Sequence, residues 1–294
     1  MASIAVERPL DRAAGVRRAS SRTALLLLVL AVLWGAWEGF RALGLHYGWQ
    51  HPFPVDGTTM PHIHSMIGAL FQHPNSASPL LIVTLLKAAA FTAKEAALGF
   101  AMGAIAGFAI GAVLAHSRML QRGFLPYVVA SQTVPILAIA PMVVIWFTSP
   151  QVHAPAWIAV AVIASYLTFF PVAIATLRGL QAADHRAVEL MRSYAANRWT
   201  VLWKLRFPAA LPYLFTALRV SATASIVGAI IGESPSSIAG GLGGAILNFA
   251  QYYSIQPQNL WATNIVAAAL GIVFFVAVVG AEKIVVRRAP EHVA

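Results

Sequence analysis

The sequence predicts an all-α membrane protein, a bundle of about six helices that each cross a lipid bilayer. Three observations predict this class. Only 10% of the 294 residues are charged, whereas soluble domains carry about 25%. Mean hydropathy is +0.72, and the apolar residues gather in runs of ~20 or more, the length that a spanning helix needs. Lysine and arginine occur almost only in alternate connections between these runs.

The chain is expected to begin with a cytosolic basic tail, residues 1–22, which contains five arginines and is predicted to be disordered. The apolar run that follows is longer than the ~7–15 residues of a signal peptide, and no cleavage site follows it, so we interpret it as a retained span. The six expected spans are 23–44, 84–115, 124–148, 156–178, 208–232 and 261–283.

Two of these spans have features of their own. Pro135 and Pro141 interrupt 124–148, so this span should kink or unwind locally. The span 84–115 is long enough to be tilted or to begin in the interface. Its glycines recur every four residues along one helix face, which lets another helix approach closely. These glycines are Gly99, Gly103, Gly107 and Gly111.

The positive charges predict the orientation of the chain. One side of the membrane receives the tail, residues 116–123, the loop 178–206 and the C-terminus. The extracytoplasmic loop 45–83, together with 149–155 and 233–260, contains no lysine or arginine. Because basic loops stay in the cytosol, both termini are expected to be cytosolic. The net charge of +10 is explained in the same way, and we expect no binding of nucleic acid.

The loop 178–206 carries eight charged residues between two apolar spans. Asp184 can cap a helix that runs to about Tyr194, and Asn197 can cap another that runs to Leu205. Pro208 and Pro212 would then start the next span. The loop is either a helix pair that lies on lipid headgroups or a binding surface for a partner on the cytosolic face.

Residues 187–221, AVELMRSYAANRWTVLWKLRFPAALPYLFTALRVS, resemble the cytosolic coupling loop of type I ABC importer permeases. Glu189 matches the glutamate of that family's motif, and Ala195 stands where glycine is usual. Leu190 and Met191 replace two alanines, and Phe207-Pro208 stands for Leu-Pro. Two further segments are similar to the branch that imports sulfonates, nitrate, pyrimidine precursors and riboflavin. They are SQTVPILAIAPMVVIWF at 131–147 and IGESPSSIAGGLGGAI at 231–246.

This resemblance implies a permease core over 84–290 that moves a small organic solute inward by alternating access. The partners it implies are separate ABC ATPase subunits, an extracytoplasmic binding protein and a second permease copy, most simply in a homodimer in the bacterial inner membrane. No G-x-x-x-x-G-K-[ST] motif occurs, so ATP and Mg²⁺ are expected on the ATPase and no cofactor on this chain. The residues expected to contact the ATPase are Arg186, Glu189, Leu190, Met191, Ala195, Asn197 and Pro208.

Candidates for the substrate path are polar and aromatic residues within the spans. They are Ser131, Gln132, Thr133, Trp146, Arg219 and Glu233. Arg219 could instead make a structural bond to a carboxylate or to backbone carbonyls, and Glu95 is an ionisable residue that lies within a span. The glycine-rich segment after Glu233 is interpreted as a re-entrant or gating loop, because so many glycines weaken a helix.

Several other chemistries are excluded or weighed as alternatives. The chain has no cysteine, which excludes disulfides and thiol catalysis. Five histidines lie in 45–83 (His46, His51, His62, His64 and His73), but only one acid, Asp56, is near them in that loop. We therefore expect no metal there and prefer a docking surface or an inert loop. An ion-coupled secondary transporter remains the alternative function. The substrate is expected to be a heteroaromatic vitamin precursor or a sulfonate.

Overall fold

The computed structural model describes residues 9–49, 51, 54–75, 78–234 and 240–286, with side chains from Thr23 onward. Every regular element in these ranges is a helix. The chain divides into two compact units, residues 1–69 and 70–294, and each is described by itself. Five helices in the described ranges are long and apolar enough to cross a membrane, or six if one bent pair counts as a span.

The first unit contains α1 (Pro9–His46) and the short α2 (Ile63–Ala69). Residues 9–22 continue α1 as a helix, so the expectation of a disordered tail is wrong for them, while residues 1–8 lie outside the described ranges. Four arginines and three alanines make up half of residues 9–22, and both are strong helix formers. The apolar part of α1, Thr23–His46, matches the span expected at 23–44.

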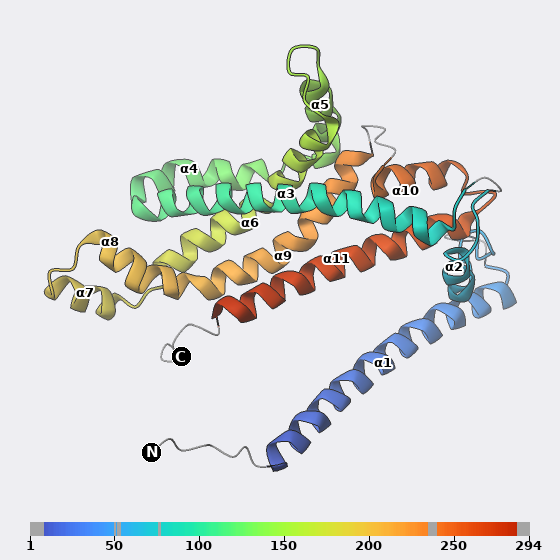
Figure 1. Ribbon diagram of the computed structural model, residues 1–294, viewed down its shortest axis with the longest axis horizontal. Coiled ribbons are helices and arrows are strands. Elements are labelled where there is room, and N and C mark those ends of the chain that lie inside the picture. Colours follow the sequence, from blue (N-terminus) through green and yellow to red (C-terminus); the bar gives the residue numbers. More distant parts are fainter. Residues whose placement is uncertain (1–8, 50, 52–53, 76–77, 235–239, 287–294) are drawn as a thin grey trace. The chain divides into compact units, whose positions relative to one another are not determined.

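The second unit is built around four long helices, α3, α6, α9 and α11, which run side by side (Figure 1). Its elements are α3 (Leu81–His116), α4 (Arg118–Ser131), α5 (Ile136–Thr148), α6 (Ala156–Gln181), α7 (His185–Ser193), α8 (Arg198–Val201), the π-helix η1 (Leu202–Arg206), α9 (Phe207–Glu233), α10 (Leu242–Gln251) and α11 (Pro257–Val286). One core cluster joins three of the long helices through apolar side chains, three of them alanine: Ala96, Val160, Ala164, Ile226 and Ala229.

The expected span 124–148 is not a single kinked helix, because α4 and α5 meet at 92°. The bend lies at residues 132–135, and Pro141 sits within α5 without breaking it. Gln132 and Thr133 donate their backbone N–H groups to Val129 and Ala130 in a tight turn. Pro135, which follows, has no N–H with which to continue the hydrogen-bond ladder of α4. The sharper break is therefore set by the turn together with Pro135.

The glycine stripe of α3 (Gly99, Gly103, Gly107 and Gly111) packs against α6, as the four-residue spacing predicted. A Cβ at Gly99 would lie 2.5 Å from the carbonyl oxygen of Ala161, and one at Gly103 would lie 2.5 Å from that of Ser165. A Cβ at Gly107 would lie 2.4 Å from the carbonyl oxygen of Phe169, and one at Gly111 would lie 2.4 Å from that of Ala173. All four glycines are buried. Two helix backbones are thus in direct contact over about three turns, which only glycine permits.

The loop between α6 and α9 has the two helix caps that the sequence predicted. The Asp184 side chain accepts the backbone N–H of Arg186 at 3.1 Å. Asn197 Oδ1 accepts the backbone N–H and the hydroxyl of Thr200 at 2.7 and 2.8 Å. These caps fix the start of α7 and the start of α8.

The span expected to start at Pro208 begins earlier, because α8, η1 and α9 form one continuous helix from Arg198 to Glu233. Phe207 donates its N–H to Leu202, five residues before it. Pro208 has no N–H, and in a regular α-helix its ring would clash with the preceding turn. The wider π-turn ahead of Pro208 fits this constraint, so the chain passes the proline without a break.

Ala195 stands in the left-handed backbone region, with φ of +53°. Its N–H bonds to the carbonyl of Arg192, and the N–H of Ala196 bonds to that of Met191 at 3.0 Å. This pair of hydrogen bonds defines a Schellman C-cap, which usually has glycine at the left-handed position. Alanine therefore adopts here the left-handed conformation that usually favours glycine.

We predict that Gly103→Leu destabilises the second unit by about 3 kcal/mol or more, because overpacking must push α6 away. The readout is the thermal melting temperature of the purified protein in detergent. Gly271→Leu in α11 is the matched control, since a Cβ there has no neighbour within 4 Å. Equal melting temperatures for the two variants would contradict the close approach of α3 and α6.

We predict that Ala195→Gly stabilises the C-terminal end of α7. The left-handed conformation costs a non-glycine residue about 1–2 kcal/mol, and the extra freedom of glycine in the unfolded chain offsets about 0.5–1 kcal/mol of that gain. Backbone amide exchange of α7, followed by mass spectrometry, should become slower. Ala182→Gly is the control, because Ala182 has an ordinary φ of −78° and its change should speed exchange. Faster exchange in Ala195→Gly would contradict the assigned conformation.

Candidate functional site

The helix α7 presents an exposed face that no part of the described chain covers. Arg186, Glu189 and Leu190 share this face, and all three are exposed. Val188 points the other way and is buried. Within the described part of the chain, Glu189 pairs with His185, across one helical turn and at 3.3 Å, and both side chains are largely exposed. The capped helix is therefore held by Val188 and offers a mixed apolar and charged face to a partner.

Four predicted contact residues remain. Met191 is partly buried, whereas Ala195, Asn197 and Pro208 are exposed. Trp199 and Trp203 on the following helix are also exposed, at 69% and 55%. Exposed tryptophans are unusual on a surface that meets only water, and large exposed apolar patches mark interaction sites.

A basic groove lies beside α7, between the ends of α3 and α6 and the start of α4. Its volume is about 750 Å³. Four arginines and two histidines are among its lining residues: Arg118, Arg122, Arg192, Arg206, His116 and His185. No carboxylate is among the lining side chains in the described ranges. The groove therefore concentrates positive charge next to the exposed face, and charge of one sign in a cleft attracts the opposite charge.

Ser131, Gln132 and Thr133 lie together at the break between α4 and α5. The Ser131 carbonyl accepts the hydroxyl of Tyr166, and the Thr133 hydroxyl bonds back to Ala130 at 2.7 Å. The buried Nε2 atom of Gln132 has no hydrogen-bond partner among the described residues. A buried donor without a partner is costly, so Gln132 is the member of this group that fits a ligand contact best.

Trp146 is not part of that group. It lies ten residues beyond the start of α5, about 15 Å along the helix, and is 67% exposed. Its ring packs edge-on against Phe147, and it borders an open hollow of about 530 Å³ near the end of α5. The structure therefore separates Trp146 from the polar residues with which the sequence grouped it.

Arg219 on α9 forms a two-point ion pair with Glu282 on α11. Arg219 Nε lies 2.7 Å from Glu282 Oε2, and a second nitrogen of the guanidinium contacts Oε1. Glu282 is the more buried partner. This is the structural alternative that the sequence left open for Arg219. Glu282 was missed, although a lone acid and a lone base on two apolar helices already suggest a pair.

Glu233 is fully buried and joins α3, α9 and α10. Its Oε1 accepts the hydroxyl of Thr92, and its Oε2 accepts the N–H of Gly243, both at 2.6 Å. Thr92 in turn accepts the N–H of Leu242 at 2.9 Å. We call Thr92, Glu233, Leu242 and Gly243 the Glu233 clasp. The carboxylate accepts the N–H of Gly243 and the Thr92 hydroxyl accepts that of Leu242, so two N-terminal amides of α10 are satisfied at the end of the helix that favours negative charge.

The sequence predicted a loop after Glu233 because of its glycines, but part of this segment forms a helix. Gly243 and Gly244 lie within α10, while part of the proposed gating loop, residues 235–239, lies outside the described ranges. A Cβ at Gly241 would collide with the Glu233 carboxyl group, and one at Gly243 would collide with the carbonyl of Ile230. These glycines are required for the close approach of α10 to α9, and this requirement outweighs their poor helix propensity.

Glu95 is the second buried acid of this region, one turn along α3 from Thr92. It is 0% exposed, and neither carboxyl oxygen has a hydrogen-bond partner among the described residues. Glu233 and Lys94 are its charged neighbours. The ammonium of Lys94 turns away, to a position 5.0 Å above the ring of Trp157. Two acidic side chains are thus buried together without a cation between them.

The chain is similar to known transport proteins. The model of the family described as "Binding-protein-dependent transport system inner membrane component" matches residues 99–289. The riboflavin transport system permease protein RibX of Chloroflexus aurantiacus is 32% identical over 138 residues, 47% of this chain and 48% of RibX. The chain therefore spans about half the length of that relative.

Two further relatives align over more of their length. A probable ABC transporter permease protein of Haemophilus influenzae is 30% identical over 209 residues, which cover 70% of this chain and 75% of the relative. The putative aliphatic sulfonates transport permease protein SsuC of Bacillus subtilis is 27% identical over 245 residues, 83% of this chain and 80% of SsuC. All three are named permease proteins rather than enzymes.

The family match covers the glycine stripe, the capped helix α7, the Arg219–Glu282 pair and all of the Glu233 clasp except Thr92. It confirms the resemblance inferred from the motif around Glu189. The chain therefore belongs to the family of binding-protein-dependent transport system inner membrane components, the multi-pass permease subunits of ABC importers.

Proposed function

We propose that this chain is the transmembrane subunit of an ATP-driven importer and that a separate ATPase subunit drives it through α7. The observation that carries this proposal is the exposed face of α7, a short helix that is capped at both ends and that carries Glu189 at the motif position. A family of importer permeases supplies the context, and the exposed tryptophans beside α7 enlarge the docking surface. The solute would move into the cytosol by alternating access.

A stiff connection supports this role for α7. Beyond the Schellman cap at Ala195, the chain enters a continuous helix of 36 residues, Arg198–Glu233. Such a helix is about 54 Å long. Its far end holds Glu233, which binds α10 through Gly243 and α3 through Thr92. A displacement of α7 would therefore be carried along one rigid element to the Glu233 clasp.

The partners follow from the same proposal. ATP and Mg²⁺ would bind the ATPase, and an extracytoplasmic binding protein would deliver the solute. The basic groove beside α7 would face acidic groups of the ATPase. The distribution of lysine and arginine supports a cytosolic position for α7 and both termini. One chain offers one α7, so two copies would serve two ATPase subunits, and the exposed outer face of α5 is available for pairing (Leu137, Met142, Ile145 and Trp146).

We propose a heteroaromatic vitamin precursor as the substrate, with a sulfonate as the alternative. The RibX relative is named for riboflavin transport, and SsuC for aliphatic sulfonates. Arg219, the arginine within α9, is neutralised by Glu282 and offers no charge to a sulfonate. The unpaired amide of Gln132 suits a ring nitrogen or carbonyl, because such a group accepts one hydrogen bond.

An ion-coupled secondary transporter is the second candidate, and the buried acids Glu95 and Glu233 favour it. Carboxylates within a membrane bundle commonly serve proton or ion pathways. Uptake that survives ATP depletion but collapses with an ionophore would select this candidate over the ATP-driven importer.

We predict that Glu189→Lys abolishes uptake without unfolding the helices. The substitution reverses the charge of the exposed α7 face and places an ammonium group beside His185. Solute uptake and ATPase activity are measured in proteoliposomes that contain the purified complex. Uptake should fall at least tenfold, through either a lost ATPase subunit or ATP hydrolysis without transport.

Gln251→Lys is the control for this substitution, because it adds a lysine at the exposed end of α10, on the opposite side of the expected membrane. It should leave uptake intact. Normal uptake by Glu189→Lys, with the ATPase still bound, would overturn the assignment of α7.

We predict that native cells without this chain lose uptake of radiolabelled riboflavin or of a pyrimidine precursor and keep uptake of taurine. In a complemented strain, Gln132→Leu should lower uptake at low solute concentration about tenfold, because a buried hydrogen bond to the solute is lost. Thr133→Val is the control, since the Thr133 hydroxyl bonds its own backbone. Loss of taurine uptake instead would select the sulfonate alternative.

A further inference from the structure

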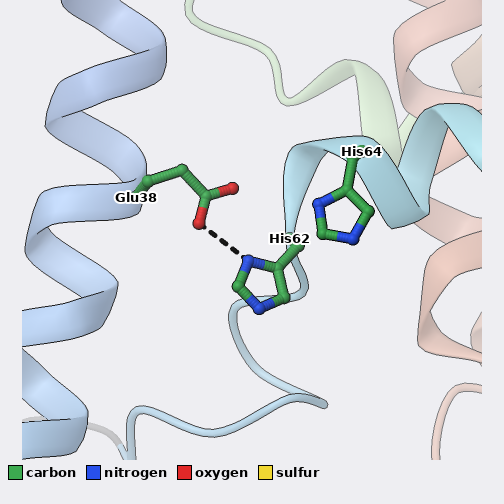
Figure 2. A group of neighbouring side chains, drawn as sticks. All are labelled: Glu38, His62 and His64. Carbon is green, nitrogen blue, oxygen red and sulfur yellow. Dashed lines mark hydrogen bonds and ion pairs between the residues drawn. The ribbon is translucent and has the colours of Figure 1, made fainter.

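A cluster of three potential metal ligands lies in the first unit, on elements that the proposed transport mechanism does not use (Figure 2). Glu38 comes from α1, His62 directly precedes α2, and His64 lies in its first turn. One carboxylate oxygen and one ring nitrogen from each histidine lie within 4.8 Å of one another. The two imidazole rings are 4.9 Å apart between their centroids.

The sequence predicted no metal at these histidines because Asp56 was the single acid near them in the loop. In the structure, Asp56 is engaged in other hydrogen bonds. Its Oδ1 accepts hydrogen bonds from the hydroxyl and N–H groups of Thr58 and Thr59. These bonds, with the Thr58 hydroxyl foremost, lower the pKa of Asp56 to about 2. The acid that completes the cluster is Glu38, which lies 24 residues before His62 and is brought to it by the fold.

The cluster is held in place by bonds on both sides. Glu38 Oε1 accepts the backbone N–H of Ile63 at 3.1 Å, while Oε2 faces His62 Nδ1 at 2.8 Å. Trp37 Nε1 and Arg41 Nε bind the backbone carbonyls of Pro61 and Met60. The segment before α2 is thereby fixed against α1. Orientation of a ligating carboxylate by a second hydrogen bond is typical of metal sites.

The position of Glu38 in α1 adds a reason for a cationic partner. It lies eight residues, or about 12 Å, before the end of an apolar helix that is long enough to span a membrane. An ionised carboxylate at such a depth is costly without a partner. His62 supplies a hydrogen bond, and a divalent cation would supply far more charge.

The donor set selects the class of metal. Two imidazoles and one carboxylate are the ligands of many zinc sites that keep a fourth position for water, with bonds of about 2.0–2.2 Å. Ligand atoms around such a tetrahedral ion are about 3.3 Å apart, so Glu38 Oε2 and His62 Nδ1 need to separate by only about half an ångström from their present distance. His64 is exposed and leaves the site open to an entering ion.

Arg41 is the feature that opposes a cation. Its Nη1 lies 3.4 Å from His62 Nδ1, and its charge repels a metal at that nitrogen. The anchoring bond from Arg41 to Met60 keeps the guanidinium on the loop side of the cluster. We therefore expect an ion that exchanges with its surroundings rather than one that is permanently bound.

We propose that Glu38, His62 and His64 form a binding site for a first-row divalent transition-metal ion, with Zn²⁺ as the best match. The bound ion ties residues 60–64 to α1. The proposal is independent of the transport mechanism, because it needs neither α7 nor a bound solute.

The test uses the full-length protein, purified with an affinity tag that contains no histidine. After the chelator has been used and removed, the protein is dialysed to equilibrium against Zn²⁺ alone, and bound zinc is counted by mass spectrometry as the excess of zinc in the protein chamber. We expect one zinc ion per chain and a higher melting temperature with zinc. Co²⁺ in place of Zn²⁺ should give the intense visible bands of a tetrahedral site.

His64→Ala is the decisive variant, because His64 is exposed and its removal should leave the metal-free melting temperature unchanged. It should lose the zinc-dependent rise in melting temperature and the cobalt bands, and its zinc affinity should fall at least tenfold. His51→Ala, an exposed histidine of the same unit outside the cluster, should behave like the wild type. Equal zinc binding by His64→Ala and wild type, or no zinc on the wild type, would overturn the site and leave only the Glu38–His62 hydrogen bond.

Discussion

The close approach of α3 and α6 is the constraint on which the second unit depends. Four glycines at intervals of four residues bring the α3 backbone into contact with the backbone carbonyls of α6. This contact sets the axis and rotation of α3, and so decides which of its other side chains point inward. Thr92 and Glu95 precede the first glycine on the same inward side of α3, and both are buried. The Glu233 clasp can form only because the stripe fixes Thr92 against α9 and α10.

The position of the Glu233 clasp also depends on the long helix that links it to the α7 end of the unit. Asn197 starts a helix that continues without interruption to Glu233, and the π-turn before Pro208 preserves that continuity. At one end of this helix lies the exposed face of α7, and at the other end lies the buried carboxylate that holds α10. Local backbone chemistry at three positions, Ala195, Asn197 and Pro208, thereby decides whether the two ends of the unit are connected stiffly or loosely. The proposed coupling to an ATPase relies on the stiff connection.

Much of the fold could be predicted from the sequence, because its strongest signals are local. Apolar runs, the caps at Asp184 and Asn197 and the glycine spacing each depend on residues within one or two turns. Contacts between distant segments were missed for the same reason. Glu38 and His62, Arg219 and Glu282, and Thr92 and Glu233 are paired by packing, which no local pattern encodes. The glycines after Glu233 led to the prediction of a loop because their helix propensity is poor. In the structure they leave the space that the Glu233 carboxylate occupies.

The ion pair between Arg219 and Glu282 has a consequence for how the bundle can move. A two-point pair between a guanidinium and a carboxylate fixes both distance and direction, and here it lies between two helices flanked by apolar side chains. Sliding α9 by one turn past α11 would separate the two charges and leave the more buried Glu282 without its partner. The pair therefore favours one register of these two helices. In the proposed alternating-access cycle, α9 and α11 would move together as a rigid body, and relative motion would occur between other pairs of helices.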